Sequence, residues 1–281
     1  MPPPPPPSAP TQKLPGVKHI VAVGSGKGGV GKTTVAVNLA IALAEMGQLV
    51  GLLDADVYGP NVPLMLGKTE APQISGDDPR QPHIQPLSNY GVRFMSMGLL
   101  NPGDQPVVWR GPMLHSAMQQ FLRQVEWGEL DCLLIDLPPG TGDVALSLAQ
   151  SVPLDGAVVV TTPSDVSLQD GRKAIRMFQQ LHIRLLGVVE NMSTFSCPHC
   201  HQAVDIFSHG GGEATAEKFG VPFLGALPLL PEVRQGGDQG KPVALAGPNS
   251  ELARPFYDLA RRCLEGLAGD GAAAGVLHVR P

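Results

Sequence analysis

Short apolar segments alternate with amphipathic segments along most of the chain. The apolar segments are rich in Val, Ile and Leu, which is typical of strands that are buried on both faces of a parallel sheet. They lie at residues 19–24, 49–54, 92–97, 131–136, 156–162, 184–190 and 222–227. Between most of them, apolar residues recur at the spacing of one helix face. This spacing predicts helices at residues 34–46, 111–126, 143–151, 166–181, 212–220 and 250–267.

Strands that alternate with helices predict right-handed βαβ units. The expected fold class is therefore α/β, with a doubly wound, mostly parallel sheet and helices on both faces. Residues 17–267 are enough for one such domain with a sizeable core, so we expect a single domain. Residues 68–90 are rich in Pro, Gly, Asp and Gln, and we expect them to form an irregular surface insertion.

Composition narrows the range of partners and locations. The 281 residues carry a net charge of −5 without a basic tract, which argues against a nucleic-acid partner. No apolar run approaches the ~20 residues that span a bilayer, so we expect no membrane partner and a cytoplasmic location. Residues 1–16 include a run of proline at 2–7 and are predicted to be a disordered or extended tail, with a ligand for a partner domain as a second reading. Residues 268–281 are predicted to be a loose tail.

A glycine-rich segment follows the first predicted strand and opens the first predicted helix. Its residues are Gly26, Lys27, Gly28, Gly29, Val30, Gly31, Lys32, Thr33 and Thr34, and the first eight match the phosphate-binding pattern G-x-x-x-x-G-K-[ST]. Glycines let backbone N–H groups point at phosphate oxygens, and the helix N-terminus adds partial positive charge. Lys32 is expected to reach the outer phosphates, and Thr33 to offer its hydroxyl to Mg²⁺. The segment predicts an ATP-type nucleotide site, although the pattern does not require the second lysine, Lys27.

Acidic residues follow two predicted strands, at the edge of the sheet where this glycine-rich segment, a P-loop, is expected. Asp54 and Asp56 end one strand, and Asp136 ends another. A nucleotide hydrolase needs an acid that holds Mg²⁺ and a group that orients the attacking water. We assign the first role to Asp136 and the second to Asp56, which is also expected near the ion, with Asp54 in support. Asp143 and the loop 138–142 either sense the γ-phosphate or, as the alternative, Asp143 caps the next helix.

The pair Cys197 and Cys200 forms a C-x-x-C motif after the strand that ends at residue 190. A thioredoxin-like redox motif would open a helix, and this segment does not look helical. His199, His201 and His209 are candidates to complete a zinc site, but their spacing fits no strong zinc pattern. A symmetric dimer would instead supply four thiolates, which hold either zinc or a [4Fe–4S] cluster. The remaining alternative is a simple buried or idle pair that binds no metal.

The other two cysteines, Cys132 and Cys263, lie in a predicted core strand and in the last predicted helix. Free cysteines are commonly buried, and four cysteines in a chain of this length do not indicate a disulfide framework. We therefore expect both to be structural.

Together these motifs resemble a known family. The P-loop with its extra lysine, Lys27, is similar to the deviant Walker A loop of the MinD/ParA/nitrogenase-iron-protein class of P-loop NTPases. Four further segments look like one branch of that class, the Mrp/ApbC/NBP35-like iron–sulfur cluster carrier ATPases. They lie at residues 54–60, 106–112, 136–143 and 191–200, within a likeness that runs from about residue 15 to about residue 265.

The resemblance implies further roles. Lys27 would reach across a dimer interface to the partner's nucleotide, and Asn191 would read the adenine ring. Cys197 and Cys200 would bridge a [4Fe–4S] cluster between the subunits of a homodimer, which would hydrolyse ATP slowly and pass the cluster to apo iron–sulfur proteins. Relatives with an added N-terminal domain, an N-terminal cysteine cluster or a presequence show features not visible here, so a bacterial, cytoplasmic, single-domain carrier is expected.

Two other functions compete with the cluster carrier. A MinD/ParA-like positioning ATPase would call for a basic amphipathic helix at the C-terminus, which residues 266–275 do not resemble, and it leaves the cysteine pair unexplained. The other is a zinc-stapled interaction protein that uses nucleotide only structurally. The carrier accounts for the most residues, but the sequence leaves open which apo-proteins receive the cluster and whether hydrolysis drives loading or release.

Overall fold

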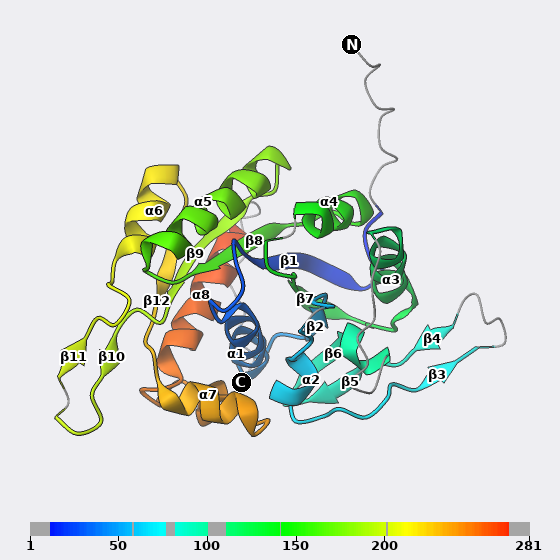
Figure 1. Cartoon of the computed structure of the whole chain (residues 1–281). Coiled ribbons are helices and arrows are strands. Elements are labelled where there is room, and N and C mark those ends of the chain that lie inside the picture. Colours follow the sequence, from blue (N-terminus) through cyan, green and yellow to red (C-terminus); the bar gives the residue numbers. More distant parts are fainter. Residues whose placement is uncertain are drawn as a thin grey trace, which may run out of the picture.

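A computed structural model describes residues 12–57, 59–76, 82–100, 111–140, 142–200 and 202–269. One eight-stranded sheet runs through the molecule in the order β12-β9-β8-β1-β7-β2-β6-β5 (Figure 1). Its strands pair in parallel, except that β5 runs antiparallel to β6 at one edge. The predicted α/β class with a doubly wound, mostly parallel sheet is confirmed.

The strands of this sheet lie within a few residues of their predicted positions wherever one was predicted. Strands β2, β8 and β9 are buried along their whole length, because helices cover both faces of the sheet. Since the strands are parallel, their carboxyl ends meet at one edge. The strands are β1 (Val17–Ser25), β2 (Val50–Asp54), β5 (Leu87–Asn89), β6 (Val92–Ser96), β7 (Leu130–Asp136), β8 (Gly156–Thr161), β9 (Leu185–Asn191) and β12 (Phe223–Leu227).

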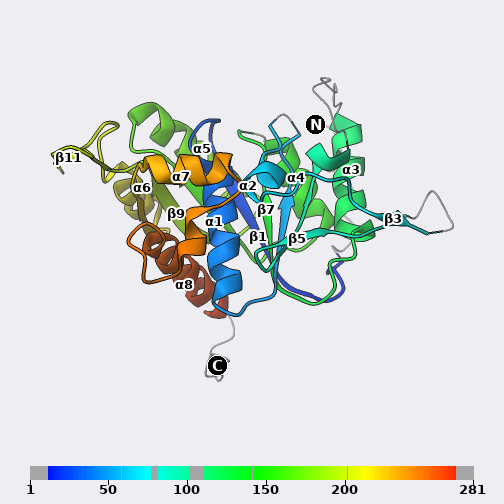
Figure 2. The same cartoon turned by 90° about the horizontal axis from the view of Figure 1, so that it is seen from below.

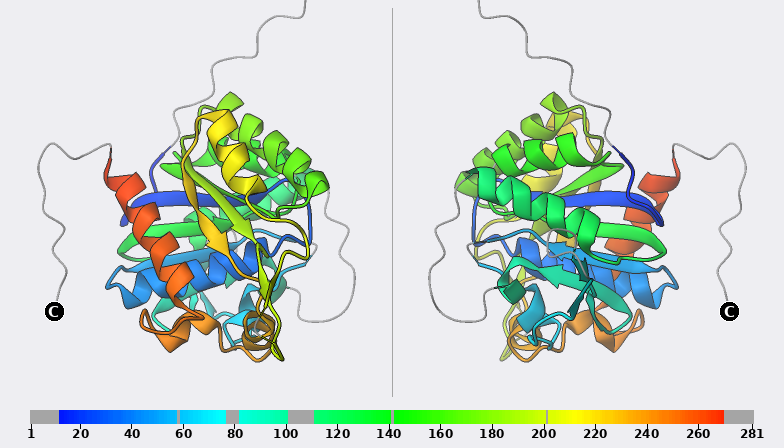
Figure 3. Two further views of the ribbon diagram at one scale, coloured as in Figure 1. Left: turned by 90° about the vertical axis from the view of Figure 1, so that its left-hand side faces the viewer. Right: turned by 90° about the vertical axis from the view of Figure 1, so that its right-hand side faces the viewer.

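Helices form a layer on each face of the sheet (Figure 3). Helices α1 (Lys32–Glu45) and α8 (Arg254–Ala268) pack together on one face. The other face is covered by a row of neighbouring helices, α3 (Gly111–Gln124), α4 (Gly142–Ser151), α5 (Asp165–Gln180) and α6 (Gly211–Phe219). All six were predicted, within four residues at each end.

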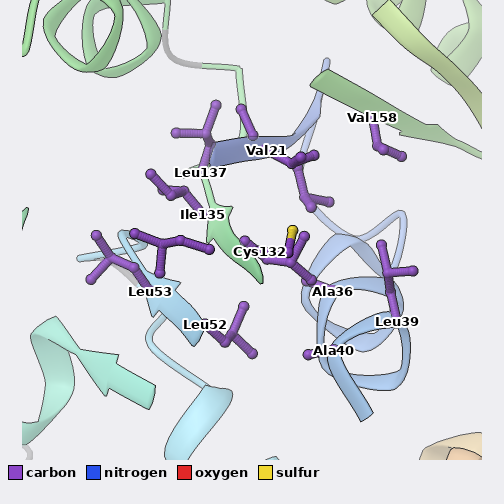
Figure 4. Close-up of a cluster of buried hydrophobic side chains, with 14 of the residues drawn as sticks. Val21, Ala36, Leu39, Ala40, Leu52, Leu53, Cys132, Ile135, Leu137 and Val158 are labelled. Carbon is purple, nitrogen blue, oxygen red and sulfur yellow. The ribbon is translucent and has the colours of Figure 1, made fainter. Parts of the chain in front are cut away.

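The core between α1 and the central strands is shown in Figure 4. Leu52 and Ile135 from the strands and Ala36 and Leu39 from α1 are fully buried, and Cys132 lies among them. Burying a large aliphatic side chain stabilises a fold by about 1.5–3 kcal/mol. This packing fixes α1 against the sheet and therefore fixes the P-loop that precedes α1.

The expectation of a wholly irregular insertion at residues 68–90 is wrong. Strands β3 (Ile74–Ser75) and β4 (His83–Ile84) form a short antiparallel ladder, and β5 extends the main sheet. Ile84 is buried and forms a bridge with Val125, which ties the ladder to the domain. These strands are only two or three residues long and lie among prolines and glycines, so they leave no strand pattern in the sequence.

Several short elements were not predicted. They are α2 (Val62–Met65), α7 (Pro231–Asp238), the hairpin β10 (Phe195–Ser196) with β11 (Ala203–Val204), and the 3₁₀ turns η1 (Met97–Leu100) and η2 (Val243–Ala246). Helix α7 contains Gly236 and Gly237, and glycine disfavours a helix by about 1 kcal/mol per residue. Its packing against α2 outweighs that preference.

Three sequence predictions fall on residues outside the described ranges. They concern residues 1–11 of the N-terminal tail, most of the motif at 106–112, and residues 270–281 of the C-terminal tail. Within the described part of the chain, no helix has the length and apolar character needed to cross a membrane.

Phe178 of α5 supports the strand that leads into the P-loop. Its ring is fully buried beneath Gly24, where an added Cβ would lie 3.0 Å from the ring. We expect Phe178→Ala to lower the free energy of unfolding by about 3–5 kcal/mol, because it leaves a cavity in the core. Urea unfolding measures this change. Gln179→Ala, at an exposed position on the same helix, should change it by less than about 0.5 kcal/mol, and equal effects would contradict this packing.

Candidate functional site

The P-loop joins the end of β1 to the start of α1. Helix α1 begins at Lys32, slightly earlier than predicted, so this lysine lies in its first turn. Gly29 and Gly31 have φ angles of +80° and +79°, a conformation that glycine adopts without a steric penalty. At Gly26, any Cβ would overlap the backbone of Asp170 on α5. These glycines therefore curve the loop around the helix N-terminus, which is the arrangement of an anion site.

A cavity of about 530 Å³ opens beside this loop, and its volume is in the range of small-molecule sites. Of the predicted residues in the P-loop and at the strand ends, Gly26, Asp54 and Asp136 do not form part of its wall. The others from the P-loop and strand ends do: Lys27, Gly28, Gly29, Val30, Gly31, Lys32, Thr33, Thr34, Asp56 and Asn191.

Asp136 lies directly behind the P-loop, fully buried at the end of β7. Its Oδ1 accepts a hydrogen bond from Lys32 Nζ at 2.7 Å, and its Oδ2 accepts one from the Thr33 hydroxyl at 2.6 Å. Lys32 Nζ also lies 4.0 Å from Oδ2 of Asp56. Burial raises the pKa of Asp136, while the Lys32 ammonium opposes that rise. The structure thus brings the predicted phosphate lysine and the predicted Mg²⁺ acid into contact.

Asp54 supports the loop that carries Asp56. Its carboxylate accepts hydrogen bonds from the N–H of Asp56 at 3.1 Å, the N–H of Val62 at 3.2 Å and the hydroxyl of Ser96 at 2.9 Å. Burial raises the pKa of Asp54 to about 8, and the nearby Asp136 adds to the rise. Ser96 was not predicted as a site residue, because it lies in no motif. Its role becomes visible only when β2 pairs with β6 and places Ser96 opposite Asp54.

Two predicted residues lie at the rim of this arrangement. Lys27 is half-buried in the cavity wall and forms no ion pair with the residues that the structure describes. Asp143 is exposed in the first turn of α4, where a carboxylate is favoured by the helix dipole, and it does not line the cavity. In the loop 138–142, Pro139 lines the cavity, and Thr141 lies outside the described residues.

Asn191 ends β9 on the opposite side of the cavity. Its Nδ2 donates a hydrogen bond to the Val30 carbonyl at 2.9 Å, so it contacts the P-loop itself. The wall beyond it is largely apolar and suits a flat ring. Sequence reasoning missed the residues of this wall, because they lie on the unpredicted helices α2 and α7 and the segment before α7: Leu64, Met65, Pro228, Leu229, Leu230 and Val233.

The cysteine pair lies on a projecting hairpin, which we call the cysteine arm (residues 195–209; Figures 1 and 2). Cys197 N–H donates to the Gln202 carbonyl at 3.0 Å, which closes the turn. The backbone N–H groups of Cys200 and His199 donate to the Cys197 sulfur and lower its pKa, and the Cys200 thiol adds to this. The two sulfurs therefore share one side of a turn that favours the thiolate, which is the form that binds metal.

The histidines do not gather around these sulfurs in the described part of the chain. No group of three or more His, Cys, Asp or Glu side chains is placed there to hold a metal ion. His199 is exposed, and Nδ1 of His209 pairs with the carboxylate of Asp205 at 2.6 Å. His201 lies outside the described residues. The described residues of one chain thus offer two sulfur ligands and no completed zinc site.

A P-loop that follows a central parallel strand, with acids at the ends of the neighbouring strands, defines a P-loop NTPase. A sequence model of the family described as the NUBPL iron-transfer P-loop NTPase matches residues 16–264. The chain belongs to this family, which confirms the resemblance inferred from its motifs.

Proteins with about 50% sequence identity to this chain are named as iron-sulfur proteins. An iron-sulfur cluster carrier protein of Deinococcus radiodurans is 55% identical over 248 residues, which cover 88% of this chain and 69% of that protein. One of Synechocystis is 50% identical over 261 residues, covering 92% and 74%. An Arabidopsis thaliana protein named as an iron-sulfur protein required for NADH dehydrogenase, mitochondrial, is 49% identical over 256 residues, covering 91% and 80%.

Solved structures share the architecture. A nucleotide-binding protein from Archaeoglobus fulgidus, in complex with ADP, is 35% identical with a TM-score of 0.68, and the match covers 82% of this chain and 89% of that one. The cell division ATPase MinD of Pyrococcus furiosus is 24% identical with a TM-score of 0.62, covering 88% and 98%. The likeness to MinD shows the fold alone.

The four cysteines differ in accessibility. Cys132 and Cys263 are buried, and burial raises both pKa values, that of Cys263 to about 12. Cys197 is half-buried, and Cys200 is exposed. We expect a thiol reagent at mildly alkaline pH to label two sulfurs per folded cluster-free chain quickly, and all four after denaturation. Mass spectrometry of labelled peptides identifies them, and fast labelling of Cys132 in the folded chain would contradict the described core.

Proposed function

We propose that this protein binds and hydrolyses ATP, holds a [4Fe–4S] cluster between two copies of the chain, and delivers it to apo-proteins. One observation carries the proposal: a nucleotide-sized cavity and an accessible turn that carries two cysteines, Cys197 and Cys200, occur on one domain. The cluster is cargo in this account. The relatives named as cluster carriers support its chemical identity.

The nucleotide half of the proposal rests on the P-loop. The glycines at 28, 29 and 31 offer backbone N–H groups to phosphates, and Asn191 with the apolar wall takes the base. Lys32 exchanges its contact with Asp136 for the outer phosphates of ATP, since both are anions that compete for one ammonium. Asp56 orients the attacking water, and Lys27 reaches the nucleotide of the partner copy.

Thr33, Asp56 and Asp136 fit Mg²⁺, because hydroxyl and carboxylate oxygens are the donors that this ion prefers. Thr33 Oγ1 and Asp136 Oδ2 lie only 2.6 Å apart at the end of the P-loop. Bound there, Mg²⁺ neutralises charge on the outer phosphates. Asp54 keeps the Asp56 loop in place beside them.

The homodimer follows from the number of ligands. A [4Fe–4S] cluster is held by four thiolates, and the accessible pair of one chain supplies two. A two-fold axis between two arms supplies the other two. The arm also exposes Val204, Ile206 and Phe207, which are 48%, 51% and 41% accessible. Apolar side chains grouped beside the cysteines favour a surface that a second copy covers.

The other readings have less support. Likeness to MinD concerns the fold alone and leaves the cysteines without a use. A zinc-stapled dimer would use the same four sulfurs and is therefore an outcome of the first test below. The cytoplasmic location stays a prediction, and the Arabidopsis relative is named as mitochondrial.

Anaerobic reconstitution with iron and sulfide tests the cargo. We expect one [4Fe–4S] cluster per two chains, measured by visible absorption and by iron and sulfide analysis. The double variant Cys197→Ala/Cys200→Ala should take up none, because it removes all four ligands of the dimer. Cys263→Ala is the matched control: it removes a buried thiol and should keep the full cluster content.

Two results of that experiment would overturn the cargo assignment. One is stoichiometric cluster uptake by the double cysteine variant. The other is a chain that rejects iron and sulfide but binds one zinc ion per two chains, which would favour the zinc-stapled dimer.

Lys27 and Lys32 are expected to act in different subunits. Lys32→Ala should abolish ATP binding, whereas Lys27→Ala should keep binding but slow hydrolysis by about 100-fold, a typical loss for one charge-stabilising group. Mixing the two variants should restore part of the turnover, because the Lys27→Ala chain binds ATP and receives Lys27 from its partner. ATPase assays measure this, and a mixture no faster than its parts would show that Lys27 does not act across the interface.

A further inference from the structure

Strand β9 ends in two residues that face different parts of the molecule. Successive side chains of a strand point to opposite faces of a sheet, so Asn191 and Glu190 diverge. Asn191 contacts the P-loop at the Val30 carbonyl and lines the cavity. Its Nδ2 lies so close to Gly31 that any Cβ there would overlap it. The strand end is therefore fixed against the nucleotide cavity on one side.

Glu190 fixes the same strand end to the far leg of the cysteine arm. It is 1% accessible. Its Oε1 accepts a hydrogen bond from the Gly210 N–H at 3.0 Å, and its Oε2 accepts one from the Gly212 N–H at 2.6 Å. These amides open helix α6, directly after the arm ends at residue 209. Lys and Arg side chains of the described residues form no ion pair with this carboxylate, so the helix N-terminus compensates its charge.

The close approach at this junction depends on glycine. Gly210 has a φ of +77°, in the left-handed region. An added Cβ at Gly212 would lie 2.8 Å from the Glu190 Cβ. The junction therefore holds the arm at one distance from β9, with little freedom to shift while both hydrogen bonds last.

The two residues that precede the arm, Ser193 and Thr194, are fixed to the end of β12 and to the segment between β12 and α7. The N–H and hydroxyl of Ser193 donate to the Leu227 carbonyl at 3.0 and 3.2 Å. The Leu229 N–H donates to the Thr194 carbonyl at 2.9 Å, and Leu229 lines the cavity. The two ends of the arm thus join segments that carry residues of the cavity wall, Asn191 on one side and Leu229 on the other.

We propose that Glu190 is the positioning residue through which nucleotide in the cavity sets the geometry of the Cys197–Cys200 turn. The inference rests on the proposed nucleotide site. A nucleotide that contacts Asn191 and Leu229 favours one placement of the end of β9. Glu190 passes that placement to Gly210 and Gly212, and so to the arm. A ligand shifts such an equilibrium only by its difference in affinity for the two placements.

The experiment compares thiol labelling of the cluster-free full chain with and without the non-hydrolysable analogue AMPPNP and Mg²⁺. It uses a dilution at which light scattering shows monomers in both conditions, so that dimerisation does not shield the sulfurs. We expect the analogue to change the labelling rate of Cys197 and Cys200 by about fivefold or more, at the low end of typical coupling between sites. Glu190→Gln should bind the analogue with unchanged affinity but show a rate ratio close to one.

Two further variants separate positioning from general destabilisation. Gly212→Ala disrupts the same junction from the helix side, because its Cβ would overlap Glu190. It should also lose the effect of AMPPNP on the labelling rate. Asp155→Asn is the matched control: its carboxylate accepts the Ile20 N–H at 2.8 Å, a similar bond away from the arm. It should keep the response even if its melting temperature falls. Because the readout is a ratio within each variant, a uniform loss of stability does not imitate the effect.

The outcomes are distinct. A wild-type chain that does not bind AMPPNP would defeat the proposed nucleotide site itself. Binding without any change in labelling, or an undiminished response in both Glu190→Gln and Gly212→Ala, would overturn the role of Glu190 and leave the nucleotide site standing.

Discussion

The parallel pairing of β7 with its two neighbours is the constraint on which the site depends. Val23 of β1 and Asp54 of β2 lie opposite Asp136 from either side. The P-loop leaves β1 two residues later, so it must pass in front of a buried carboxylate. Burying such a group is costly unless charge and hydrogen bonds compensate it. Lys32 and Thr33 provide that compensation, and their contact with Asp136 makes the loop, the helix and the acid one unit.

Much of this was predictable from the sequence, for identifiable physical reasons. Strands buried on both faces leave uninterrupted apolar runs, and amphipathic helices leave their own spacing, so the parallel strands and the six main helices were found. The P-loop is a local pattern whose glycines have local conformational reasons. Asp54, Asp56 and Asp136 were found because a strand end places its acid at the sheet edge whatever the rest of the fold does.

The parts that could not be predicted depend on contacts between distant segments. Helix α7 contains two adjacent glycines and forms where it packs against α2, so its contribution to the cavity has no local signal. Ser96 matters through its hydrogen bond to the Asp54 carboxylate, and Glu190 through two hydrogen bonds from backbone N–H groups about 20 residues further along the chain. The C-x-x-C pattern located the cysteines, but only the folded turn shows N–H groups supporting the Cys197 sulfur.

Two separate features of one chain require a second copy in this account. Lys27 lies in the cavity wall with no described carboxylate to pair with, and the accessible cysteines supply half the ligands of a cluster. The most direct measurement is native mass spectrometry of the anaerobically reconstituted protein with ATP and Mg²⁺. The account predicts a species of two chains that contains one [4Fe–4S] cluster. Clusters or zinc ions bound stoichiometrically to single chains would contradict it.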